Sequence, residues 1–182
     1  MTRVYYIAAE FDLVEKPEWL DGFRAKYDEP FKYHVTLKAP TLIDESQLAS
    51  IRKKLVVITE RFERFEVVFD RYDFGKTDSG HVVMIFAGPN PTLAELQRAV
   101  QQELAGVGQF AKPQYAKFDS DFRPHITIAR HLDDARFTEA KTELKEPVLC
   151  KASVTGITLA VSDPSVPVDP TRAQTTTYAF KI

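Results

Sequence analysis

The chain has 182 residues, a formal net charge of −2 and 44% hydrophobic residues. The near balance of charges argues against the extended phosphate-tracking surface that non-specific duplex binding needs, so any nucleic acid would be held locally, at an end. The hydrophobic content suffices for one compact core, and a single cysteine, Cys150, excludes an internal disulfide and indicates a buried thiol in a reducing compartment. No segment approaches the ~20 apolar residues of a membrane span, so we expect a cytoplasmic protein without membrane contact.

The first half of the chain predicts the order strand, helix, strand, helix, strand. Strands are indicated near residues 4–7, at the segment after His34, and at residues 65–69, where apolar residues alternate. Asp44 and Gln47 resemble a capping box that opens a helix. The two helices carry apolar residues at steps of three and four: Trp19, Leu20, Phe23 and Tyr27 in the first, and Leu48, Ile51, Leu55, Ile58 and Phe62 in the second.

The second half predicts the same order again. Residues 82–86 form an apolar run typical of a strand, and Asn90-Pro91 begins a helix. A strand after His125, a weaker helix from Asp134 to Leu144 and two closing strands at about 152–161 and 175–182 follow. We therefore expect a single domain, residues 1–182, with an internal repeat at approximately 1–80 and 81–182.

Three stretches are predicted to be irregular. Residues 106–121 place Tyr115 and other aromatic residues among lysines, a mixture that can stack a base and hold a phosphate, although we favour a surface loop with anchoring aromatics. Residues 71–80 are rich in Gly, Asp and Ser and look like a hairpin connection, and residues 162–174 contain three prolines, so both are expected to be solvated loops.

One short pattern occurs twice, as His34-Val35-Thr36-Leu37 and as His125-Ile126-Thr127-Ile128. On a strand, residues i and i+2 point to the same face, so each copy presents an imidazole beside a hydroxyl while the branched residues face the core. A single copy is explained by an ordinary half-buried strand. Two accidental copies are expected only about 2% of the time at ordinary amino-acid usage, so the repeat indicates a shared chemical role.

Cations flank both copies of the pattern. The first is preceded by Phe31-Lys32-Tyr33 and the second by Phe122-Arg123-Pro124. If the strands are regular, Lys32 and Lys38 share a face with His34, and Arg123 shares one with His125. A cation, an imidazole and a hydroxyl together suit a phosphate, because the first and last hold its oxygens and the imidazole can exchange a proton near neutral pH.

The repeated His-x-Thr-apolar pattern resembles the defining motif of the 2H phosphoesterase superfamily, which includes 2′-5′ RNA ligase-like proteins and cyclic nucleotide phosphodiesterases. The stretch from Phe122 to Arg130 is similar to the second motif of the RNA ligase-like branch. The resemblance implies an α+β, bilobal fold: two pseudo-twofold-related lobes of antiparallel sheet, flanked by helices, with a central cleft. His34 and His125 would then face each other across that cleft.

This resemblance and the chemistry of two imidazoles predict a metal-independent phosphodiesterase that acts on 2′,3′-cyclic phosphates of nucleotides or RNA ends by general acid and base catalysis. Alternatives are 2′-5′ RNA ligase or 2′-5′ phosphodiesterase activity, or a module that binds a nucleotide or RNA end without turnover. The predicted catalytic residues are His34, Thr36, His125 and Thr127. The predicted substrate- or phosphate-binding residues are Lys32, Lys38, Arg123 and Tyr115.

No cofactor and no metal are expected, since the sequence lacks a helical His-Glu arrangement, a calcium-loop pattern and the glycine-rich nucleotide-binding motifs. The predicted partner is a nucleotide cyclic phosphate or an RNA terminus, without extended duplex binding. We expect the protein to be a monomer. Which histidine is the acid and which the base is not determined by the sequence.

Overall fold

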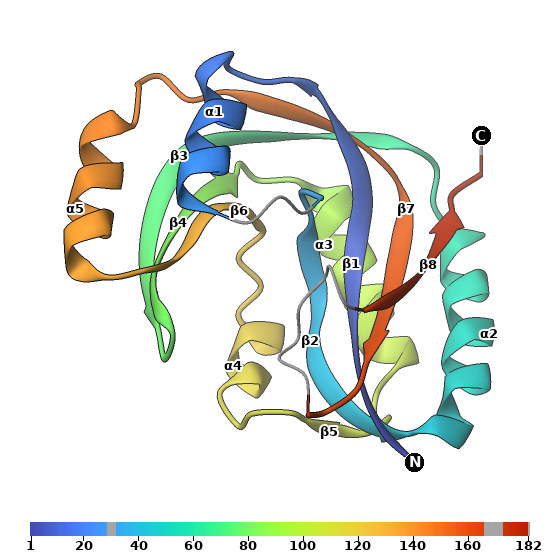
Figure 1. The fold of residues 1–182 in the computed structure, drawn as a ribbon. Helices are drawn as coiled ribbons and strands as arrows, with labels where there is room; N and C mark the ends of the chain where they lie inside the picture. Colours follow the sequence, from blue (N-terminus) through green and yellow to red (C-terminus); the bar gives the residue numbers. More distant parts are fainter. Residues whose placement is uncertain (29–31, 166–172, 182) are drawn as a thin grey trace.

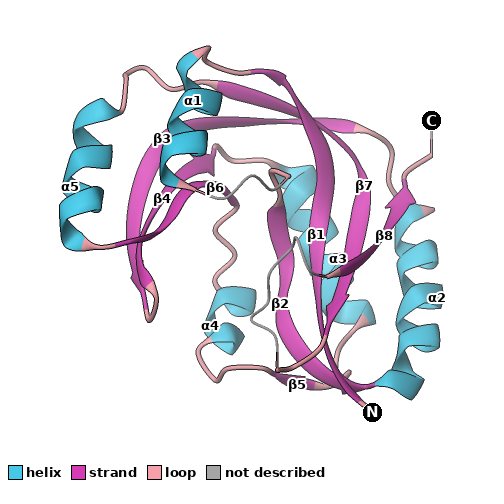
Figure 2. Ribbon diagram, viewed as in Figure 1, coloured by secondary structure: helices cyan, strands magenta, loops and turns pink. Residues whose placement is uncertain are grey.

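The structure, a computed structural model, describes residues 1–28, 32–165 and 173–181. Within these ranges it is an α+β fold with one antiparallel sheet of eight strands and five α-helices (Figures 1 and 2). The strands are β1 (Thr2–Glu15), β2 (Val35–Asp44), β3 (Phe65–Thr77), β4 (Gly80–Ala87), β5 (Gln109–Phe110), β6 (His125–Leu132), β7 (Cys150–Ser162) and β8 (Gln174–Ala179). The helices are α1 (Trp19–Tyr27), α2 (Leu48–Thr59), α3 (Pro91–Glu103), α4 (Tyr115–Ser120) and α5 (Asp134–Glu143).

The strand order is symmetric about the centre of the sheet. It runs β5-β2-β1-β7-β3-β4-β6, with β8 paired to β7. The last strand of each half of the chain joins the strands of the other half. β3, from the first half, pairs with β4, and β7, from the second half, pairs with β1. β3 and β7 also pair with each other at the centre of the sheet. The order strand, helix, strand, helix, strand therefore occurs twice, with β5, α4 and β8 as additions. The internal repeat itself stays a prediction.

The sheet is strongly curled. The motif strands β2 and β6 lie near opposite ends of the strand order, yet they contact each other directly. Helices α2 and α3 pack together, with α3 against β2 and α2 against β7 and β8, whereas α1 and α5 pack against β6 (Figure 1). The side chains of β1 that face α2 and α3, such as Tyr5 and Ile7, are fully buried. The curl thus brings the two halves of the predicted site toward each other.

The predicted elements agree with the observed ones except in two connecting regions. Residues 71–80 join a hairpin, as expected, but they are not a long solvated loop, because β3 continues to Thr77 and pairs with β4 up to Gly80, leaving only a tight turn. Cross-strand pairs such as Tyr72 with Ile85 hold this hairpin and outweigh the local turn composition.

Residues 106–121 are less irregular than expected. They contain the short strand β5 and the helix α4, and α4 lies against β2. Of the predicted loop at 162–174, residues 166–172 lie outside the described residues, as does Phe31. Cys150 is buried, as the sequence indicated, and burial raises the pKa of its thiol to about 11.

Candidate active site

The two motif strands have the same local geometry. His34 immediately precedes β2 and His125 is the first residue of β6. The branched residues between and after the motif positions are buried: Val35, Leu37, Ile126 and Ile128. Thr36 pairs with Ala8 of β1, and Thr127 pairs with Met84 of β4. Thr36 is exposed and Thr127 is half-buried, so each strand keeps its hydroxyl on the face opposite the core.

Both imidazoles are held in the same way. The Nδ1 atom of His34 lies 3.3 Å from the carbonyl oxygen of Lys32, and the Nδ1 atom of His125 lies 2.7 Å from the carbonyl oxygen of Arg123. A carbonyl oxygen only accepts, so each Nδ1 carries the proton and donates it. The Nε2 atom of a neutral ring is then left as a proton acceptor, which is the form a general base requires.

An aromatic ring from the adjacent strand lies beside each imidazole. The ring centroid of Tyr6 on β1 is 6.2 Å from that of His34, and the ring centroid of Phe86 on β4 is 5.2 Å from that of His125. These contacts restrict the orientation of each imidazole in addition to the Nδ1 hydrogen bond. The two halves of the site are therefore matched in their supporting residues as well as in their motifs.

The surroundings of both histidines favour the neutral form. Burial, opposed by the hydrogen bond to the Lys32 carbonyl and assisted by the charges of His125, Arg130 and Arg24, lowers the pKa of His34 from 6.5 to about 4. Burial and the Arg123 guanidinium also lower the pKa of His125, while the Asp73 carboxylate opposes this shift. The charge of His125 is one of the influences that lower the pKa of His34, so the two imidazoles are within electrostatic reach of each other although 91 residues separate them.

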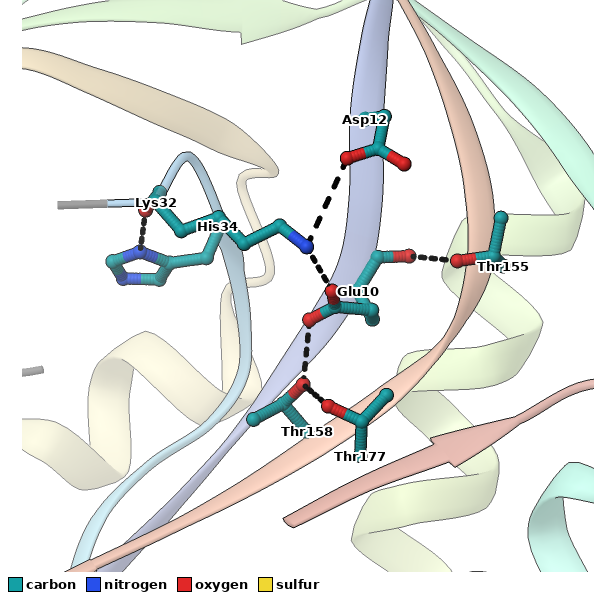
Figure 3. Close-up of polar contacts among 7 residues, drawn as sticks. All are labelled: Glu10, Asp12, Lys32, His34, Thr155, Thr158 and Thr177. Atoms are coloured by element: carbon teal, nitrogen blue, oxygen red, sulfur yellow. Dashed lines mark hydrogen bonds and ion pairs between the residues drawn. The ribbon is translucent and has the colours of Figure 1, made fainter. Parts of the chain in front are cut away.

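The two cations before the motifs are both held by carboxylates. Lys32 forms ion pairs with Glu10 and, at 3.8 Å, with Asp12, both on β1. Arg123 pairs with Asp73 on β3 at 3.0 Å, and its guanidinium carbon lies 4.7 Å from the centre of the Phe86 ring. Figure 3 shows the Lys32 side chain extending toward β1 and away from the His34 imidazole. Both cations are near the motifs, but each is already partly neutralised.

Lys38 does not lie with His34. The pairing of β1 with β2 shifts between Thr36 and Lys38, so Lys38 pairs with the core-facing Ile7. This β-bulge reverses the alternation on which the sequence prediction depended. The Lys38 ammonium is buried and pairs with Asp119 of α4 at 3.2 Å, with side-chain exposures of 6% and 9%. Lys38 therefore links β2 to α4.

Arg130 and Arg24 were not selected from the sequence, but the structure places both near His34. The Nε atom of Arg130 donates to the fully buried carboxylate of Asp28 at 2.7 Å. The guanidinium of Arg24, on α1, lies over the Tyr33 ring with its carbon 4.0 Å from the ring centre. A second β-bulge, at Ile128 of β6, resembles the one in β2. It places Ala129 opposite Val83 on the core face and so turns Arg130 to the other face. Recognising that bulge in the sequence would have been needed to find Arg130.

Tyr115 is the first residue of α4. Its ring packs against that of Phe118, with the ring centroids 6.2 Å apart, and Lys112 lies near its hydroxyl. In the part of the chain that the structure describes, no three His, Cys, Asp or Glu side chains are grouped to hold a metal ion. None of the described helices is long and apolar enough to cross a membrane.

The fold, the paired His-x-Thr strands and the matched supporting contacts define a two-histidine phosphoesterase. A model of the 2′-5′ RNA ligase superfamily matches residues 14–165, and the chain belongs to this family. A putative phosphoesterase of Geobacillus kaustophilus is 26% identical over 132 residues, which cover 70% of each protein. An RNA 2′,3′-cyclic phosphodiesterase of Bacillus subtilis is 29% identical over 107 residues, covering 58% of this chain and 55% of that protein.

Solved structures share the fold. The crystal structure of E. coli LigT complexed with 3′-AMP has a TM-score of 0.62 and 19% sequence identity, with all of both chains covered. The protein TT0787 of Thermus thermophilus has a TM-score of 0.55 and 17% identity, covering 96% of this chain and 94% of that one. These comparisons support a hydrolase that acts on phosphodiesters as the general kind of enzyme.

Proposed function

We propose that the protein is a metal-independent phosphodiesterase that opens 2′,3′-cyclic phosphates of nucleotides or RNA ends by general acid and base catalysis. The observation that carries this proposal is the matched pair His34 and His125, in which each Nδ1 is bound to a backbone carbonyl, so that Nε2 is the nitrogen that gains or loses a proton. A pure phosphate-binding module gains little from two titratable groups where arginines would grip an anion better.

In the proposed reaction, neutral His34 accepts a proton from water through Nε2 as the water oxygen attacks phosphorus. The bond from phosphorus to one ribose oxygen breaks, and protonated His125 donates its Nε2 proton to that oxygen. Lowering of the pKa of His34 by burial and cations supports its role as the base. The Asp73 carboxylate, which raises the pKa of His125 against the effect of burial, supports the role of His125 as the acid.

Thr36 and Thr127 are proposed to donate hydrogen bonds to the non-bridging phosphate oxygens, where charge develops in the transition state. Arg123 and Lys32 are proposed to offset that charge without direct contact with the phosphate. Each is already paired with a carboxylate, Arg123 with Asp73 and Lys32 with Glu10. Arg130 is proposed to act with them because its charge is felt at His34. Lys38 and Tyr115 are left out of the mechanism: Lys38 faces the core, and the ring of Tyr115 packs on Phe118.

The test is a turnover screen with EDTA-treated protein. The panel contains 2′,3′-cyclic mononucleotides, oligonucleotides with cyclic ends, 2′-5′ linked oligomers and pairs of tRNA halves. We expect cyclic phosphates to be opened to monoesters. Cleavage or joining restricted to 2′-5′ linkages would assign the site to the alternative chemistry, and nucleotide binding without any turnover would identify a binding module.

The threonine variants should be impaired less than the histidine variants. Thr36→Val and Thr127→Val each remove one neutral hydrogen bond to a phosphate oxygen, which corresponds to about a tenfold loss of kcat/KM. Thr138→Val is a matched control, because the Thr138 hydroxyl donates within α5, to the carbonyl oxygen of Asp134. A loss as large as that of the histidine variants would indicate that a hydroxyl acts as the nucleophile.

A further inference from the structure

A pocket adjoins His34 on the concave side of the sheet. Its volume is about 280 Å³, near the lower limit for small-molecule sites. Strands β1, β7 and β8 supply its floor, and Tyr6, Glu10, Thr158 and Thr177 are among the lining residues. Because His34 lines the same pocket, a phosphate bound at the imidazole would place the rest of the substrate beside these polar groups.

A chain of hydrogen bonds crosses this floor (Figure 3). The Thr158 hydroxyl lies 2.7 Å from Oε2 of Glu10 and 3.2 Å from the Thr177 hydroxyl. Oε1 of Glu10 accepts from the Lys32 ammonium. Glu10 is thus held from both sides, with 18% of its side chain exposed.

The direction of these hydrogen bonds follows from the number of protons. An ionised carboxylate only accepts, so Thr158 uses its single proton on Glu10. Thr177 must therefore donate to Thr158, and its own oxygen is left as an acceptor. The oxygen atoms of this hydrogen-bond network, from Glu10 to Thr177, can therefore still accept hydrogen bonds but have no proton left to donate. This favours a ligand that brings hydrogen-bond donors.

Charge restricts the ligand further. Glu10 and Asp12 are two carboxylates close to one ammonium, that of Lys32, so the local balance is negative. A second phosphate would be repelled here, whereas an uncharged group with N–H donors would replace water on Glu10. Among the parts of a nucleotide, a base with an exocyclic amino group meets this requirement best. Uracil offers only its ring N3–H, and the carbonyl on each side of that N–H would face the Glu10 carboxylate.

We propose that this pocket binds the base of the substrate and that Glu10 is a specificity-determining residue that selects a base with an exocyclic amino group. This inference rests on the proposed function, since the base is placed by a phosphate at His34. Cytosine and uracil form the sharpest comparison, because they match in size and differ only in the 4-amino group of cytosine against the 4-carbonyl and N3–H of uracil. A hydrogen bond to a charged acceptor corresponds to a preference of about tenfold or more.

The experiment measures the affinities of cytidine 3′-monophosphate and uridine 3′-monophosphate by calorimetry, and kcat/KM for the two 2′,3′-cyclic phosphates. We expect wild-type protein to prefer the cytidine ligands by about tenfold, and Glu10→Gln to reduce this ratio to within about threefold. The readout is the ratio between the cytidine and uridine ligands rather than either affinity alone. Glu10→Gln also removes the carboxylate that pairs with Lys32, and this change affects both ligands alike. Thr177→Val should reduce the preference in part, and Thr177→Ser should restore it.

Thr155→Val is the matched control. The Thr155 hydroxyl bonds the backbone carbonyl of Glu10 at 3.4 Å rather than its carboxylate, so the ratio should stay at the wild-type value. Equal affinities for the two ligands in wild-type protein, or a preference unchanged in Glu10→Gln, would overturn the proposal. Failure of the proposed function would look different: neither cyclic phosphate would be turned over, while the affinity ratio would still report on Glu10.

Discussion

Replacing either His34 or His125 by alanine is expected to lower kcat by about 10²–10⁴-fold, the usual contribution of a general acid or base. The free energy of unfolding should change little, because neither histidine is among the buried core residues. Burial also disfavours the charged form of both imidazoles, so removing them loses no favourable charge. The variants are compared by initial rates on a cyclic mononucleotide and by urea unfolding. Since the two histidines act as a unit, the double variant should be only slightly slower than the slower single variant.

His131→Asn is the matched control for this experiment. His131 follows the second motif on the same strand, its ring bonds the Ser79 hydroxyl at 2.9 Å, and its φ of 57° is a conformation that asparagine tolerates. Its kcat should remain within about twofold of wild type, as for a surface substitution away from the site. A histidine variant that unfolds but keeps its activity per folded molecule would show that the ring has a structural role instead.

The second large effect concerns stability. Asp119→Ala is expected to lower the free energy of unfolding by about 3–5 kcal/mol, because it leaves the Lys38 ammonium buried without its carboxylate. It also removes the 2.8 Å hydrogen bond that the Ala39 amide donates to Asp119. Urea unfolding measures this loss. The exposed neighbour Asp121 supplies the control, and Asp121→Ala should change stability by less than about 0.5 kcal/mol.

The pair can also be removed as a whole. In Lys38→Met combined with Asp119→Leu, both charges are replaced by apolar groups, so most of the lost stability should return. Single and double variants together give the coupling between the two side chains. If Asp119→Ala costs under about 1 kcal/mol, the ammonium of Lys38 reaches water, and its assignment as a buried link between β2 and α4 is wrong.

The sequence predicted those parts of the fold that depend on local pattern. The capping box of Asp44 and Gln47 is present at the start of the 3-10 turn before α2, and Asn90 caps α3 by accepting from the Leu93 amide. The pairing of each imidazole with a threonine on one strand face also followed from alternation alone. These features are set by residues a few positions apart, where backbone geometry leaves few choices.

What the sequence could not predict depends on pairing across strands. Lys38 was placed with His34 because nothing local signals the bulge that turns it toward the core. Glu10 lies in the middle of β1 and becomes part of the site only through Lys32 and Thr158, which are 22 and 148 residues away in the chain. The extension of β3 to Thr77 likewise depends on its partner β4.

The pH dependence of kcat/KM, measured on a 2′,3′-cyclic nucleotide with and without EDTA, tests the two-histidine mechanism most directly. Below the maximum, activity should fall as the base takes up a proton, and the pKa of His34 is lowered to about 4. Above it, activity should fall as the acid loses its proton, and the pKa of His125 is lowered from 6.5. We therefore predict a bell-shaped profile that has its maximum below pH 6.5 and is unchanged by EDTA. Because the two histidines are coupled, the apparent pKa of each limb belongs to the pair and not to one residue. A rate that keeps rising into alkaline pH, or that EDTA abolishes and a divalent ion restores, would contradict the mechanism.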